Sequence, residues 1–149
     1  MKKLYPHIYF WFTAVIILLI GEFHYGSQVL DINIHDTYFV AEYRHVEIVL
    51  CFLYTLVGML YWIYNRLNIK LVSNLTAIHT IVTLGTVYLY HSGVIYYTYF
   101  SPNQSIFYNT NELFFNYMLF FSALIAQLFF IINSIFSVVK HIMHTKSQT

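Results

Sequence analysis

Histidine and carboxylate side chains are the residues of this chain that are best suited to bind a metal ion or a cofactor. His35 is followed directly by Asp36, and such a pair can offer a nitrogen and a hard carboxylate oxygen to a metal ion. His45 and His91 lie at the edges of two apolar segments, where imidazoles from facing helices can hold a haem iron. Asp36 and Thr37 are also good helix-capping residues. The sequence thus predicts a candidate metal site at His35 and Asp36, with capping of a helix N-terminus as the alternative. It also indicates His45 and His91 as candidate haem ligands.

A third histidine, His79, belongs to the same apolar segment as His91 but differs in depth and direction. Twelve residues separate them, so on a helix they lie about 18 Å apart along the axis and point about 120° apart. These two side chains therefore cannot ligate one iron. Hydroxylated residues recur on the His79 side of the segment, which is typical of hydrogen bonding between membrane helices; they are Thr76, Thr83, Thr86 and Tyr90.

The elements that carry these residues follow from the composition. Of 149 residues, 59% are hydrophobic and only 9% are charged, whereas soluble domains contain about 25% charged residues. A bilayer span needs about 20 mostly apolar residues, and four such segments are present. We predict an all-α, integral membrane protein with a single membrane domain over 1–149, folded as a four-helix antiparallel bundle. Its helices cover about 6–24, 46–65, 73–97 and 113–139, with long loops at about 25–45 and 98–112.

Positive and negative charges fall on different loops, with Arg44 as the only basic residue on the acidic side. The basic residues of the two tails and of the loop between the second and third helices are Lys2, Lys3, Arg66, Lys70, Lys140 and Lys146. All six acids lie on the two long loops or at their edges: Glu22, Asp31, Asp36, Glu42, Glu47 and Glu112. Short loops rich in Lys and Arg stay in the cytoplasm. We therefore predict that both termini are cytoplasmic and that the two long loops face outside.

Several function classes receive no support from the sequence. The single cysteine, Cys51, excludes an intramolecular disulfide. No zinc-finger spacing, phosphate-binding glycine loop or nucleophile motif is present. The net charge of +1 gives no indication of nucleic-acid binding.

The stretch His35-Asp36-Thr37-Tyr38-Phe39-Val40-Ala41 is the most specific motif of the chain. It resembles the His-Asp-Thr-Tyr-aromatic-Val-Val-Ala-His-aromatic-His signature of haem-copper oxidase subunit I, the catalytic subunit of cytochrome c and quinol oxidases. In that family the signature opens the tenth of twelve membrane helices and carries axial haem histidines. The front half of the signature is intact here and the haem-binding half is altered.

Weaker matches follow in the same order as in that family. Gly58-Met59-Leu60-Tyr61-Trp62 resembles the inner end of the tenth helix, and Ile78-His79, Gly85 and His91 resemble the eleventh. The polar loop after Pro102 and the last apolar segment fit the end of the family fold. The resemblance thus implies that this chain corresponds to the last four of the twelve helices.

The parts of the family that are missing here imply a different activity. The copper ligands and one haem ligand of the family come from helices that have no counterpart in this chain. The arginine pair that contacts haem propionates is also absent, since residues 98–112 contain no Arg or Lys. The resemblance therefore implies that this chain alone does not reduce oxygen, and we expect it not to be an enzyme.

Two alignments of the haem positions remain open. Without a gap, the two signature histidines fall on Tyr43 and His45; with one valine deleted, they fall on Glu42 and Arg44. A deletion rotates downstream residues by about 100° on a helix. We prefer the ungapped alignment, which places His45 at a haem-ligand position.

Three functions are compatible with these observations. The first is a non-catalytic accessory or structural component of a respiratory membrane complex, held among other subunits or in a homo-oligomer in the bacterial inner membrane. The second is a small haem-binding or electron-transfer membrane protein that uses His45. The third is a structural or sensing membrane protein that has kept an old fold.

Overall fold

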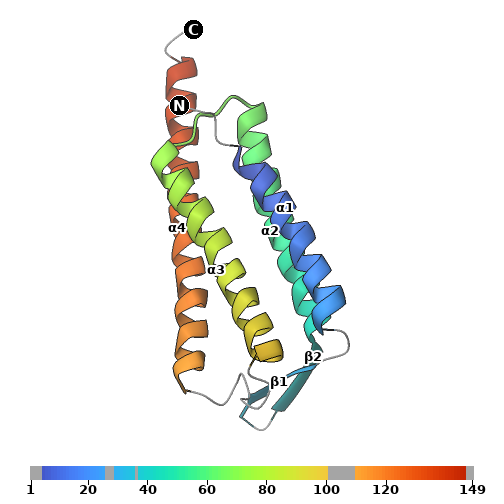
Figure 1. The fold of residues 1–149 in the computed structure, drawn as a ribbon. Helices are drawn as coiled ribbons and strands as arrows, with labels where there is room; N and C mark the ends of the chain where they lie inside the picture. The colour runs from blue at the N-terminus through green and yellow to red at the C-terminus, as the bar shows by residue number, and fades with distance from the viewer. Residues whose placement is uncertain (1–4, 26–28, 36, 101–109, 147–149) are drawn as a thin grey trace. The chain divides into compact units, whose positions relative to one another are not determined.

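The computed structural model describes residues 5–25, 29–35, 37–100 and 110–146. The chain is mainly helical, with the elements α1, η1, β1, β2, α2, α3 and α4 in this order (Figure 1). It divides into two compact units, Met1–Ile63 and Tyr64–Thr149. We describe each unit in turn.

The first unit pairs α1 (Pro6–Ile20) with α2 (Tyr43–Arg66), whose last residues belong to the second unit. A proline opens α1, where its missing N–H is not needed. Fully buried Phe10 contacts the rings of Tyr54 and Tyr61, at centroid distances of 5.8 and 5.7 Å. Gly58 of α2 lies against the start of α1, and Gly21, just after α1, lies against the start of α2. The two helices therefore run antiparallel.

The sequence predicts an ordered loop between these helices, and the structure forms regular elements there. A short π-helix, η1 (Gly21–Tyr25), ends the first helical stretch. An antiparallel hairpin follows, made of β1 (Val29–Ile34) and β2 (Thr37–Glu42). Ile34 pairs with Thr37, so only two residues form the turn. The all-α prediction is therefore wrong for this segment, where cross-strand hydrogen bonds satisfy the backbone.

The second unit is a pair of long helices, α3 (Ser73–Phe100) and α4 (Thr110–Lys146). Val72 at the start of α3 contacts Asn133, whereas Thr83, farther along α3, contacts Gln127 earlier in α4. This pairing order shows that the helices run antiparallel, as Figure 1 also shows. The ring of Phe130 stacks on His79 at a centroid distance of 4.9 Å and lies in the contact between the helices.

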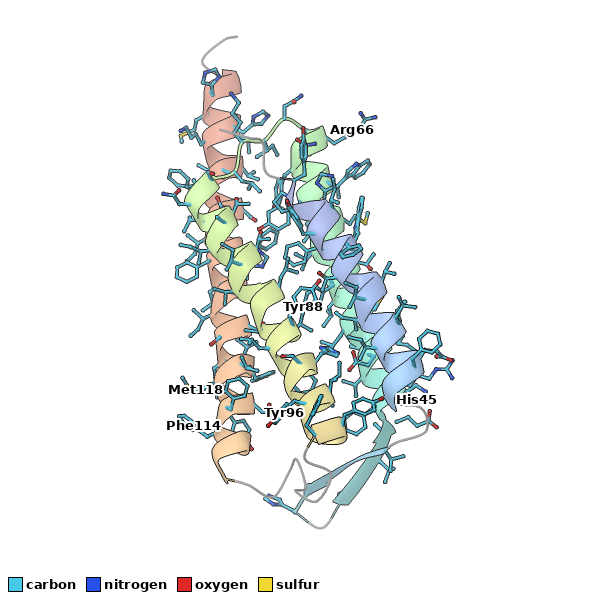
Figure 2. The ribbon with its side chains drawn as sticks, viewed as in Figure 1. His45, Arg66, Tyr88, Tyr96, Phe114 and Met118 are labelled. Atoms are coloured by element: carbon cyan, nitrogen blue, oxygen red, sulfur yellow. The ribbon has the colours of Figure 1, made fainter. Side chains whose placement is uncertain are left out.

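Three helices of the described chain are long and apolar enough to cross a membrane: Pro6–Phe23, Tyr43–Arg66 and Phe114–His144. Much of their apolar surface faces outward; Phe114 and Met118, for example, project from α4 away from α3 (Figure 2). Such surfaces indicate a lipid environment. α3 is not among these three spans, and its membrane crossing remains a prediction.

The helices extend beyond the limits that the apolar segments suggest. The second helix begins at Tyr43 and not near residue 46, the third ends at Phe100 and not near 97, and the fourth covers Thr110–Lys146 and not 113–139. Backbone hydrogen bonding does not stop where side chains become polar, so the hydrophobic length predicts the span and not the helix end.

Candidate functional site

The most developed polar cluster of the described residues lies between α3 and α4. Its centre is Asn133, whose side chain is fully buried. The Val72 N–H donates to Asn133 Oδ1 at 2.9 Å, and Asn133 Nδ2 donates to the Val72 carbonyl at 3.3 Å and to Thr76 Oγ1 at 3.0 Å. Ser137 Oγ donates to Asn133 Oδ1 at 3.3 Å. One amide thus joins α4 to the residue that precedes α3.

A second set of contacts lies one to two turns away, around Gln127. The Nε2–H of His79 donates to Gln127 Oε1, and Gln127 Nε2 donates to Thr83 Oγ1, both at 3.3 Å. His79 is fully buried and Thr83 nearly so. The predicted role of this stripe in interhelical hydrogen bonding is confirmed for His79, Thr76 and Thr83. Thr86 instead donates within its own helix, to the Thr83 carbonyl at 2.9 Å.

We call these contacts the α3–α4 polar seam. Their role is to stabilise the packing of α3 against α4. The seam comprises Val72, Thr76, His79, Thr83, Gln127, Asn133 and Ser137. Amides and hydroxyls in a low-dielectric interior are costly unless they are paired. Here they pair across the two helices, and the seam fixes the register of α3 against α4.

The structure places His35, one of the two predicted metal residues, at the end of β1. His35 is exposed and has a positive backbone φ of 55°. Asp36 lies outside the described residues, so the His35 and Asp36 metal site remains a prediction. The capping alternative is wrong, because Thr37 begins β2 and the next helix starts only at Tyr43.

His45 lies in the first turn of α2, directly after β2 (Figure 2). Its side chain is 68% exposed, and its Nδ1 lies 3.8 Å from a carboxylate oxygen of Glu42. Arg44 beside it forms an ion pair with Glu22 at 3.2 Å. Ion pairs this exposed contribute little to stability. His45 is thus accessible at a charged helix start, whereas a haem usually needs a protein pocket around it.

His91 belongs to the second unit, and its pairing with His45 remains a prediction. The side chain is 3% exposed. Its Nδ1–H donates to the Val87 carbonyl, one turn earlier in α3, at 2.8 Å. The ring of Tyr90 lies edge-on to it at 5.3 Å. These contacts hold the imidazole against its own helix, and Nε2 is the nitrogen that would ligate a metal.

Sequence reasoning missed one buried acid. Glu47 of α2 is only 1% exposed. It lies against Gly21, where an added Cβ would come within 2.7 Å of the Glu47 Cβ. The close approach of the two helices at this glycine encloses the carboxylate stem. No local pattern reveals this, since the glycine and the acid are far apart in sequence.

No cluster of three or more metal-ligating side chains occurs among the residues that the structure describes. Comparisons with protein-family models, with curated proteins and with solved structures found no match.

Proposed function

We propose that this chain is a non-catalytic structural or accessory component of a respiratory membrane complex. The resemblance of residues 35–41 to the haem-copper oxidase signature suggests the kind of complex. Residues 42–45, which correspond to the haem-binding half of that signature, are altered, and this argues against haem-copper oxygen chemistry at these positions. The outward apolar faces of the three candidate spans suit contact with lipid and with other membrane subunits.

The α3–α4 polar seam is the observation that carries this proposal. Ionisable residues within membranes usually indicate ion pathways or cofactor sites. His79 is the buried ionisable residue of this seam, and it contacts Gln127 and stacks on Phe130. A side chain used in this way supports a fixed helix pair, which is what a structural subunit requires.

We further propose that the two units form one antiparallel four-helix bundle in the bacterial inner membrane. Both termini and the loop between α2 and α3 would face the cytoplasm, because these segments carry the lysines and Arg66. The hairpin and the segment before α4 would face outside.

Affinity purification of the tagged chain from native membranes in mild detergent tests the proposal. We expect respiratory subunits to co-purify in a fixed ratio and to migrate with the chain on a native gel. A control membrane protein with the same tag should not retain them. A solitary monomer under these conditions would exclude the proposed role.

Haem binding through His45 is a second candidate, favoured by the accessibility of its imidazole. An exposed ligand at a helix start can meet a haem held by a second copy of the chain. Protein from haem-replete cells should then show a Soret band that is lost in His45→Ala. The matched control is His35→Ala, which removes another exposed histidine; a colourless wild-type preparation rules out this candidate.

A further inference from the structure

The end of α4 extends beyond the start of α3 and carries basic residues on a defined face. Asn133 is level with Val72, because the two are hydrogen bonded. From Asn133 to Lys146 the helix rises about 20 Å further. The buried positions of this part of α4 are Ala126, Phe130, Asn133, Ser134 and Ser137, and Phe130 and Asn133 among them contact α3. At the same helical spacing this face continues as Lys140, His141 and His144, all exposed.

A second group of basic residues belongs to the connection that leads into α3. Lys70 is exposed and precedes Val72 by two residues, so its Cα lies within about 7 Å of the Val72 Cα. Arg66 ends α2 and is also exposed (Figure 2). The only acid of residues 64–149 is Glu112, at the opposite end of α4. This end of the second unit is therefore a surface of one charge sign, which we call the basic shelf: Arg66, Lys70, Lys140, His141 and His144.

Helix dipoles alone do not account for the basic shelf. Cations near the C-terminus of α4 complement its negative end. Lys70, however, immediately precedes the N-terminus of α3, where the positive dipole end favours anions. The first intrahelical bond of α3 runs from the Thr76 N–H to the Val72 carbonyl at 3.0 Å. A bound anion would offset the repulsion between the positive charge of Lys70 and the positive end of the α3 dipole.

The length of α4 places this surface at the membrane boundary. Its 37 residues span about 55 Å, compared with about 30 Å for the hydrocarbon core and about 45 Å with headgroups. Exposed apolar side chains alternate with the basic ones up to Met143, including Val139 and Ile142. This mixture is typical of a segment that lies at the headgroup level.

We infer that the basic shelf binds the phosphate of an anionic phospholipid headgroup. Lys70 and Lys140 supply the main charge. The inference depends on membrane insertion and does not require membership of a respiratory complex, so the two can fail separately.

Native mass spectrometry of the purified full-length chain with added phosphatidylglycerol or phosphatidylcholine tests this inference. Wild type should retain phosphatidylglycerol preferentially. The double variant Lys70→Gln with Lys140→Gln should bind it roughly thirtyfold more weakly, as expected for two lost juxtamembrane charges. The control Lys2→Gln with Lys3→Gln removes the same charge from the N-terminal tail and should bind like wild type. Circular dichroism establishes that each variant is folded.

Three results would overturn the inference. Equal retention of both lipids by wild type would show no headgroup preference. If the Lys2→Gln with Lys3→Gln variant lost phosphatidylglycerol binding to the same extent, the binding would depend only on the net charge of the chain. Displacement of the lipid by inorganic phosphate at equal concentration would identify a free-anion site in place of a lipid site.

Discussion

At the scale of single residues, Asn133 determines how α3 begins. Its side chain makes four hydrogen bonds, two of them with the backbone of Val72. Asn133→Ala leaves buried donors and acceptors without these partners, which costs about 1–3 kcal/mol. We expect the free energy of unfolding in mixed micelles, measured by SDS titration, to fall by this amount.

The control for this prediction is Asn74→Ala, which changes an exposed asparagine of the same unit. Its free energy of unfolding should stay within about 0.5 kcal/mol of wild type, as for most surface substitutions. If the two variants were equally stable, Asn133 would not stabilise the helix pair.

The sequence predicted part of this residue-scale organisation. The His79 stripe was recognisable because its members recur at helical spacing, and His79, Thr76 and Thr83 do bond to α4. The partners Gln127 and Asn133 stand out as polar residues in an apolar helix. Glu47 was not predicted as buried, since its enclosure depends on the distant Gly21. The periodicity of polar residues indicates which face of a helix is polar, but it does not indicate which other helix packs against that face.

At the scale of elements, a glycine sets the distance between α1 and α2. A Cβ at Gly21 would lie 2.7 Å from the Glu47 Cβ, so Gly21→Ala must push the two helices apart. We expect the free energy of unfolding to fall by about 1–3 kcal/mol. The measurement is again SDS titration in mixed micelles.

Gly85→Ala is the matched control, because an added Cβ there meets nothing within 4 Å. Alanine is a better helix former than glycine. The free energy of unfolding of this variant should therefore equal that of wild type or exceed it by up to about 1 kcal/mol. A destabilisation of similar size at both glycines would contradict close helix contact at Gly21.

The hairpin turn gives a second prediction at this scale. His35 has a φ of 55°, which glycine adopts freely and β-branched residues strongly disfavour. His35→Val should therefore lower the protection of β1 and β2 amides from hydrogen exchange, by about 1 kcal/mol or more, whereas His35→Gly should preserve it. Lower protection in both variants would show that the imidazole itself, and not the backbone angle, maintains the turn.

The hairpin lies where the sequence predicted a loop, although its first strand has a recognisable pattern. Leu30, Ile32 and Ile34 alternate with Asp31 and Asn33, which is a period of two and indicates a strand. The helices themselves were predictable, because long apolar runs in a bilayer must satisfy their backbone internally.

At the scale of the whole molecule, the charge distribution predicts the orientation in the membrane. In a Cys51→Ser background, His35→Cys should react with an impermeant maleimide added to intact cells from outside. His144→Cys should react only after the cells are opened, because the proposed topology places Lys140 and Lys146 in the cytoplasm. The opposite labelling pattern would invert the proposed topology.

The central claim is that the chain serves a respiratory complex without holding redox cofactors itself. The most direct measurement is the absorption spectrum of the tagged chain, purified from native membranes in mild detergent and then transferred to a dissociating detergent. We predict haem absorbance in the first preparation, and its loss together with the partner subunits in the second. A colourless chain in mild detergent, or haem that stays with the isolated chain, would contradict the claim.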